Sequence, residues 1–136
     1  MKRPPIVADA SAVLAALMDS GPNGAWANAL LARHPIAAPH HMPVEATSAL
    51  RKAVRARTAS PEMAALALAE LHDLRIAYYP FGPFAERIWA LHTHVSSYDA
   101  WYVALAEALD APLVTFDLRL ANAHGLRCTL WTPATG

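Results

Sequence analysis

Short apolar segments alternate with longer amphipathic stretches along the whole chain, and this alternation is the feature that most constrains the fold. Uninterrupted apolar segments of only a few residues are typical of strands that are buried on both faces. The segments predicted as strands are residues 5–8, 36–38, 76–79, 113–116 and 127–131. Strands that alternate with helices indicate an α/β domain. We therefore expect a central, mainly parallel sheet with helices on both of its faces.

The stretches between these strands carry signals for the start and the end of helices. Asp9 and Ser11 offer capping side chains for a helix that runs through Leu14, Leu17 and Met18. Further helices are predicted through Trp26, Leu30 and Leu31, over residues 43–57, 61–74 and 84–91, and from Tyr98 to Leu109 after a cap at Ser97. The spacing of apolar residues gives each helix one face for the core.

The length and composition limit the class of protein. A chain of 136 residues corresponds to one compact domain, so we expect residues 1–136 to fold as a unit. The single cysteine, Cys128, cannot form an internal disulfide, which suits a reducing compartment. No apolar run approaches the roughly 18 residues of a membrane span. These features predict a soluble cytoplasmic protein.

The distribution of charge is more informative than its total. The eleven basic and eleven acidic residues give a net charge of zero, which is not the basic balance typical of proteins that bind nucleic acid. The basic residues Arg51, Lys52, Arg55 and Arg57 nevertheless lie close together in sequence. Arg51 and Arg55 are one helical turn apart and share a face. They are candidate RNA-binding residues; the alternative is a solvated helix face.

Four acidic residues occupy positions where the predicted elements end or begin. Asp9 and Asp117 directly follow predicted strands, whereas Glu45 and Asp99 lie in the first turns of predicted helices. Carboxyl ends of parallel strands, and the helix N-termini that follow them, meet at one edge of the sheet. The four carboxylates are therefore expected to converge. Each acid could instead serve only as a helix cap or a turn residue.

A cluster of carboxylates has a recognisable chemistry. Each negative charge raises the pKa of its neighbours, and a hard divalent cation such as Mg²⁺ or Mn²⁺ relieves this repulsion. Such a cation can orient a phosphodiester and lower the pKa of a bound water. Ser11 and Thr115 are candidates to hydrogen-bond the ligating carboxylates and hold them in place.

Other residue types give weaker signals. The histidine pairs His40–His41 and His92/His94 have no matching Cys or His partners for zinc. The five glycines include no phosphate-binding loop. Aromatic residues close to Asp99 could stack on nucleic-acid bases or belong to the core. They are Tyr98, Trp101 and Tyr102.

Four segments resemble, in order, the motifs of PIN-domain nucleases. They are residues 6–14 around Asp9, 43–45 with Glu45, 97–106 around Asp99, and 113–120 around Asp117. The resemblance spans almost the whole chain. It implies a PIN-like domain with four or five parallel strands. It also implies a magnesium- or manganese-dependent endoribonuclease, in which these four acids hold the metal and form the catalytic site.

The size of the chain is similar to that of VapC toxins from bacterial toxin–antitoxin pairs. This likeness implies a homodimer and a VapB-like antitoxin that lies in an apolar groove and reaches the acids with a basic side chain. The first two predicted helices offer apolar surface for such a groove, at Leu14, Leu17, Met18, Trp26 and Leu30. Two alternatives stay open: a PIN nuclease of housekeeping RNA processing, and a non-catalytic domain that binds RNA or a partner protein.

Overall fold

Five short strands form one sheet in which all neighbouring strands are parallel. The computed structural model describes residues 3–133. The strands are β1 (Ile6–Ala8), β2 (Ile36–Pro39), β3 (Ile76–Tyr79), β4 (Leu113–Val114) and β5 (Leu130–Trp131), in the spatial order β3-β2-β1-β4-β5. The expected α/β class with a parallel sheet is therefore confirmed.

The central strand β1 explains why the sequence alternates as it does. Its three residues are completely buried, because strands flank β1 on both edges and helices cover both faces. Val7 pairs with Ala37 of β2 on one side and with Leu113 of β4 on the other. The chain therefore leaves β1 toward β2 and later returns to the opposite side at β4. The strand order thus reverses between β1 and β4, and α/β sheets bind ligands at the carboxyl ends of the strands on either side of such a switch point.

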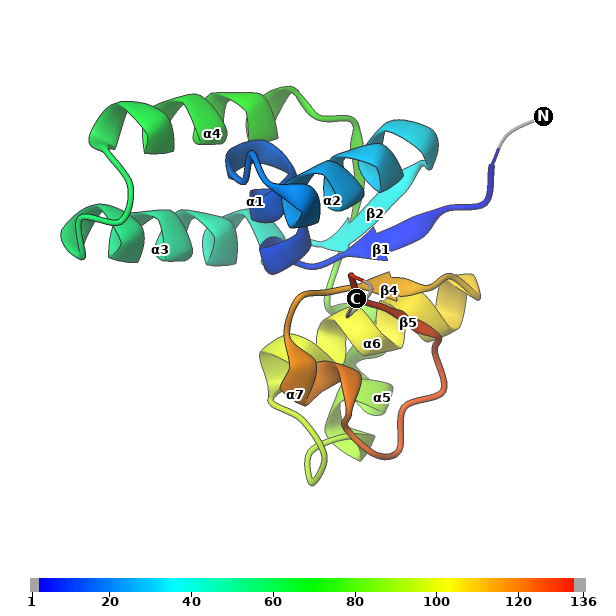
Figure 1. Ribbon diagram of the computed structural model, residues 1–136. Coiled ribbons are helices and arrows are strands. Elements are labelled where there is room, and N and C mark those ends of the chain that lie inside the picture. Colours follow the sequence, from blue (N-terminus) through cyan, green and yellow to red (C-terminus); the bar gives the residue numbers. More distant parts are fainter. Residues whose placement is uncertain (1–2, 134–136) are drawn as a thin grey trace.

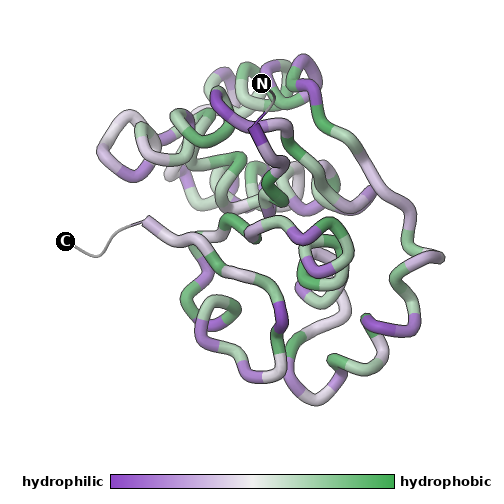
Figure 2. The backbone as a smooth tube through the Cα atoms, turned by 90° about the vertical axis from the view of Figure 1, so that its right-hand side faces the viewer, coloured by the Kyte–Doolittle hydropathy of each residue, from purple (hydrophilic) through white to green (hydrophobic). Residues whose placement is uncertain are grey.

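The helices form two layers with the sheet between them (Figure 1). One layer contains α1 (Ala10–Met18), α2 (Pro22–Arg33), α3 (Met42–Arg55) and α4 (Pro61–Asp73). The other contains the short 3₁₀ turn η1 (Gly82–Phe84), α5 (Ala85–Ala90), α6 (Ser97–Leu109) and α7 (Leu118–Ala121). Figure 2 shows hydrophobic and hydrophilic residues alternating along the helices, as expected for helices that are buried on one side.

Several predicted boundaries were wrong, each for a local reason. The strand predicted over 113–116 ends at Val114. The Thr115 N–H still donates to the carbonyl oxygen of Trp131, but the Phe116 N–H donates to the Ser11 hydroxyl instead of to a neighbouring strand. The strand predicted over 127–131 is limited to Leu130–Trp131, since its partner β4 is only two residues long.

The helix boundaries also differ. Ser96, not Ser97, caps α6: its hydroxyl accepts the N–H of Asp99. The helix predicted over 43–57 is Met42–Arg55, because Arg57 adopts a left-handed conformation that ends it. The helix α7 was not predicted, because four residues give too short a pattern.

The apolar residues of the first two helices are largely absorbed by the fold. Leu14, Leu17, Trp26 and Leu30 are partly buried and pack against the main core. Trp26 meets the ring of Phe116 edge-on, with 5.7 Å between the ring centroids. Part of the apolar surface that the sequence offered for a groove is therefore used by the core. An open pocket of about 420 Å³ remains beside α1, and Leu14 and Met18 line it.

The part of the chain that the structure describes includes no helix with the length and apolar character needed to span a membrane.

Candidate active site

Asp9 lies at the carboxyl end of β1, where it also caps α1. Only 6% of this residue is exposed, which is unusual for an aspartate. Its Oδ1 accepts hydrogen bonds from the Ser11 hydroxyl (2.6 Å) and from the Ala12 N–H (3.0 Å). Burial raises the pKa of Asp9, and the hydrogen bonds of Ser11 and Thr115 oppose this effect. The carboxylate is thus costly to ionise and firmly oriented.

Two hydroxyls connect Asp9 to the end of β4. Thr115 Oγ1 donates to Asp9 Oδ2 and accepts the N–H of Asp117 at 3.0 Å. Ser11 Oγ donates to Asp9 Oδ1 and accepts the N–H of Phe116 at 3.0 Å. Each hydroxyl therefore acts as donor and acceptor, and together they fix how the chain leaves β4. Both residues singled out from the sequence contact Asp9 directly.

Asp99 and Asp117 are electrostatic neighbours of each other and of the rest of the site. Asp99 lies in the first turn of α6, and its pKa is raised by burial first and then by the charges of Asp117 and Glu45. The charge of Asp99 in turn raises the pKa of Asp9. Asp117 caps α7 by accepting the backbone N–H groups of Arg119 (2.9 Å) and Leu120 (3.4 Å). A capping role and a place in the cluster therefore coexist at this position.

Glu45 completes the group from the first turn of α3. Its Oε1 accepts the hydroxyl of Tyr102 at 2.6 Å. Tyr102 is fully buried, and burial, together with the adjacent Glu45, raises the pKa of its phenol far above the ordinary value. The hydroxyl therefore stays protonated and can only hold Glu45 as a donor. Glu45 is in this way tied to α6, the helix that carries Asp99.

The charge balance of this edge fits a hard cation. Asp9 and Asp99 both have raised pKa values with neighbouring carboxylates among the causes, so the group is short of positive charge. Carboxylate oxygens are the ligands that Mg²⁺ and Mn²⁺ prefer. Within residues 3–133, however, no three His, Cys, Asp or Glu side chains approach closely enough to enclose an ion. The carboxylates are the kind of ligand that these ions prefer, but in this structure their side chains lie further apart than the ligands of one bound ion.

Comparisons with known proteins agree with this arrangement. The PIN-domain profile matches residues 6–126, which include all four acids. The chain is 44% identical to ribonuclease VapC1 of Mycobacterium tuberculosis over 125 residues, covering 91% of this chain and 94% of the relative. It is 39% identical to ribonuclease VapC9 of the same species, with 92% and 95% covered. The chain belongs to the PIN-domain family and is a VapC-type member of it.

Solved structures show that the fold of this PIN domain recurs at low sequence identity. PAE2754 from Pyrobaculum aerophilum aligns with a TM-score of 0.71 at 23% identity, covering 93% of this chain and 83% of that protein. VapC20 of Mycobacterium tuberculosis, described as a toxin that cleaves the sarcin–ricin loop, aligns with a TM-score of 0.66 at 18% identity, with 89% and 95% covered. These two likenesses support the fold alone.

The aromatic residues near the acids of the PIN domain have three different environments. Tyr102 is buried and holds Glu45. Trp101 is partly buried and stacks on His41, with 4.5 Å between the ring centroids and parallel planes. Tyr98 is 65% exposed, directly before Asp99. Of the three predicted candidates for base stacking, Tyr98 is thus the one with a free face.

His41 is a positioning contact that the sequence analysis missed. Its Nε2 lies 2.9 Å from the carbonyl oxygen of Tyr98, which can only accept, so Nε2 carries the proton. The same nitrogen lies 3.5 Å from Glu45 Oε1. The ring therefore joins the starts of α3 and α6. A histidine four residues before Glu45, at the start of the same helix, is the signal that could have revealed it.

Arg51 and Arg55 lie further along α3 than Glu45. Both are exposed, and they line a groove of about 380 Å³ between α3 and α4 whose floor includes Leu50, Ala64 and Leu68. Their guanidinium groups are available for a ligand. An RNA-binding role for this pair stays a prediction.

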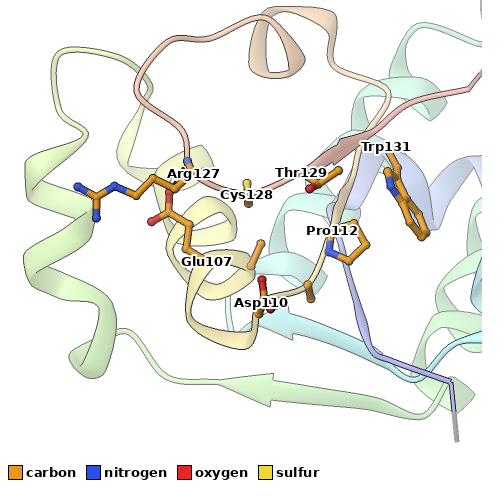
Figure 3. Close-up of a pocket in the computed structure, with 9 residues that line it drawn as sticks. Glu107, Asp110, Pro112, Arg127, Cys128, Thr129 and Trp131 are labelled. Atoms are coloured by element: carbon orange, nitrogen blue, oxygen red, sulfur yellow. Dashed lines mark hydrogen bonds between the residues drawn. The ribbon is translucent and has the colours of Figure 1, made fainter.

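A separate pocket of about 340 Å³ lies at the other end of α6 from Asp99 (Figure 3). One of its two acids, Glu107, accepts two hydrogen bonds from Arg87, at 2.7 and 3.0 Å, and one from the backbone N–H of Arg127 at 2.8 Å. These bonds lower the pKa of Glu107 against the effect of burial. An acid with this many partners has a structural role: it fastens the segment before β5 to α6.

Proposed function

We propose that this VapC-type PIN domain is a metal-dependent endoribonuclease that hydrolyses RNA phosphodiester bonds. The observation that carries the proposal is the electrostatic coupling of Asp9, Asp99, Asp117 and Glu45 at the switch point between β1 and β4. The names of the relatives as ribonucleases support the same activity.

The proposed roles follow from the contacts. Asp9, Asp99 and Glu45 would hold a Mg²⁺ or Mn²⁺ ion, and Asp117 would complete the site or a second one. Such an ion polarises a phosphoryl oxygen and lowers the pKa of bound water. Ser11 and Thr115 keep both oxygens of Asp9 in a fixed orientation, while Tyr102 does the same for Glu45. Fixed ligands reduce the reorganisation that metal and substrate binding would otherwise require.

A cleavage assay tests this activity. The purified protein should cut RNA with Mg²⁺ or Mn²⁺ and stop when EDTA is added. Asp99→Asn should abolish cleavage, whereas Glu70→Gln, at an exposed acid on α4, should not. Cleavage that survives both EDTA and Asp99→Asn would refute a metal-dependent site at these acids. RNA binding without any cleavage would favour the non-catalytic alternative.

We further propose that the chain is the toxin of a pair and that a VapB-like antitoxin occupies the pocket beside α1. This pocket of about 420 Å³ is lined by apolar side chains that include Leu14, Met18, Met63 and Phe116, and Ser11 lies at its edge. Because Ser11 donates to Asp9, a segment bound there lies next to the acids. An apolar segment carrying one basic residue would therefore match both the pocket and the charge beside it.

Two measurements address the biological setting and the assembly. Expression of the protein alone should arrest growth, and co-expression of a small protein encoded beside it should restore growth. An active protein that is harmless to cells without a partner would favour housekeeping RNA processing. Light scattering should give the mass of a homodimer, as the family resemblance predicts.

A further inference from the structure

A polar pocket adjoins the acidic site on the side of α7. Its volume is about 290 Å³, and Asp99 and Asp117 are among the residues that line it. The lining also includes His94, Ser96 and Arg119. The pocket thus extends the site from its carboxylates toward groups that bind anions. His94 and Arg119 have no role so far, and Ser96 serves only as the cap of α6.

Arg119 is the cation of this pocket and is weakly held. Among the described residues that line the pocket, it is the only arginine or lysine. Its side chain is 93% exposed, and its Nε lies 3.6 Å from Asp117 Oδ1, which is longer than a good hydrogen bond. An exposed ion pair of this kind contributes little stability. The guanidinium therefore keeps its donors free for a ligand, unlike Arg87, which is fully engaged with Glu107.

The part of the pocket around His94 is held in place by its neighbours. The ring of His94 packs against Gly125, where an added Cβ would lie 2.9 Å from His94 Nε2. Gly125 has a φ of +84°, a conformation that glycine adopts without strain, and Arg87 binds its carbonyl oxygen at 2.9 Å. The segment that supports His94 is thus fastened to α5. The pocket is a built feature of the surface between two fixed elements.

We propose that this pocket binds an RNA phosphate adjacent to the one that is cleaved, with Arg119 as its main ligand and with His94 and Ser96 as flanking donors. The inference rests on the proposed ribonuclease activity and adds a substrate subsite to it. A free anion would be repelled by Asp99 and Asp117. A phosphate that belongs to a strand already held at the acids reaches Arg119 at high effective concentration. The planar guanidinium fits two phosphate oxygens at once.

The test combines an enzyme variant with a modified substrate. In a short single-stranded RNA, one phosphate at a time on either side of the cleaved bond is replaced by an uncharged methylphosphonate. For the wild type, one of these replacements should raise KM about tenfold, because a charged hydrogen bond is lost. Arg119→Ala should raise KM by a similar factor on the unmodified RNA and leave kcat nearly unchanged, as expected for a contact remote from the reacting atoms.

The decisive result is the combination of the two changes. In Arg119→Ala the methylphosphonate should have no further effect, because its partner is absent. Arg119→Lys should give an intermediate KM, since it keeps the charge and loses the two-pronged contact. Arg75→Ala, at an exposed arginine before β3 and away from the acids, is the matched control and should behave as the wild type. Equal methylphosphonate effects in wild type and Arg119→Ala would overturn the subsite.

A binding measurement separates this inference from the proposed activity. Fluorescence anisotropy with Mg²⁺ present, on the same RNA carrying a non-hydrolysable linkage at the cleaved bond, reports the affinity without cleavage. Arg119→Ala should weaken binding and reduce the slope of log K against log salt by about 0.7, the value for one single-strand phosphate. A wild type that never cleaves RNA would refute the ribonuclease, while this slope would still decide the phosphate contact. Normal cleavage with an unchanged slope would refute the subsite alone.

Discussion

Thr115 and Asp9 are 106 positions apart in sequence, yet the Thr115 hydroxyl donates a hydrogen bond to Asp9 Oδ2 in the buried interior. The same hydroxyl accepts the backbone N–H of Asp117. One side-chain oxygen therefore links the carboxyl ends of β1 and β4 and two of the proposed metal ligands. The backbone N–H of Thr115 still donates to the carbonyl oxygen of Trp131, so the main chain stays beside β5 while the side chain serves the site.

Replacing Thr115 by valine should impair both folding and cleavage. The substitution keeps the shape of the side chain but leaves a carboxylate oxygen and an N–H without their partner. Such losses cost about 1–3 kcal/mol for a buried polar group. Urea unfolding should show the lower stability, and the cleavage rate should fall because Asp9 is no longer oriented. Thr115→Ser restores the hydroxyl and should recover most of the activity; equal activity of the two variants would contradict the positioning role.

The shared position of the four acids at one edge of the sheet could be predicted because it depends only on where strands end and helices begin. Asp9 and Asp117 follow strands that lie side by side in the sheet, and Glu45 and Asp99 begin helices at the same edge. The position of each acid relative to the apolar segments is enough to infer this, and no side-chain contact has to be known. The capping position of Asp9 was equally readable, because a cap is a local property. The cap at Asp117 was not predicted, because the helix α7 that it begins was not.

The contact of His41 with Tyr98 and the pocket of Arg119 could not be predicted in the same way. The proton on His41 Nε2 is assigned only because the carbonyl of Tyr98, 57 residues away, lies opposite it. The pocket that contains Arg119 needs the loop before α6 and the turn after β4 to meet. Both depend on how non-adjacent loops pack, and loops have no periodicity to read. The same limit applies to α7, whose four residues give no repeating pattern.

Asp99→Asn should show that the charge of Asp99 lowers the stability of the metal-free protein. The raised pKa of Asp99 means that its ionised form opposes folding above the ordinary aspartate pKa of 3.8. Its favourable contribution is complete below that pH and is lost as pH rises through the folded-state pKa. The metal-free variant should therefore match the wild type at low pH and become relatively more stable toward pH 7. Thermal melts over this range measure the difference.

The same variant should respond differently to metal. Mg²⁺ or Mn²⁺ should raise the melting temperature of the wild type, because the ion binds only the folded state. That rise should shrink in Asp99→Asn, and cleavage should fall by about 100-fold or more. In the wild type, activity should increase with pH along an acidic limb above 3.8, since the carboxylate must be ionised. A destabilised variant that still cleaves RNA would assign Asp99 to helix capping.

Arg51→Ala combined with Arg55→Ala should weaken RNA binding without changing metal affinity. Both residues are exposed on the helix that begins beside Glu45, so an RNA strand that leaves the site along α3 would meet them. Each lost phosphate contact should reduce the salt slope by about 0.7. Anisotropy titrations at several salt concentrations give this slope. An unchanged slope would identify the pair as a solvated face bordering an apolar groove.

Tyr98→Ala should lower the affinity for single-stranded RNA more than for a duplex of the same sequence. The ring is 65% exposed beside Asp99 and offers a stacking surface worth about 1–3 kcal/mol per base. Tyr98→Phe keeps the ring and should bind as the wild type does. If Tyr98→Ala and Tyr98→Phe bind equally well, stacking at this position is excluded.

Met63→Gln should weaken the complex with the antitoxin while leaving the free protein intact. Met63 is 50% exposed and lines the pocket beside α1, so a polar side chain there removes part of the apolar surface that a partner would bury. It lies three residues after the Ser60 cap of α4, where glutamine is favourable in a capping box, so α4 should not lose stability. Trp26→Ala should also weaken the complex, through Phe116, but it removes core contacts as well.

Leu66→Gln is the matched control, because Leu66 is exposed on the same helix and is not among the residues lining the pocket. Co-purification and calorimetry should give a loss of about tenfold for Met63→Gln and none for Leu66→Gln; equal affinity for both variants would place the antitoxin elsewhere.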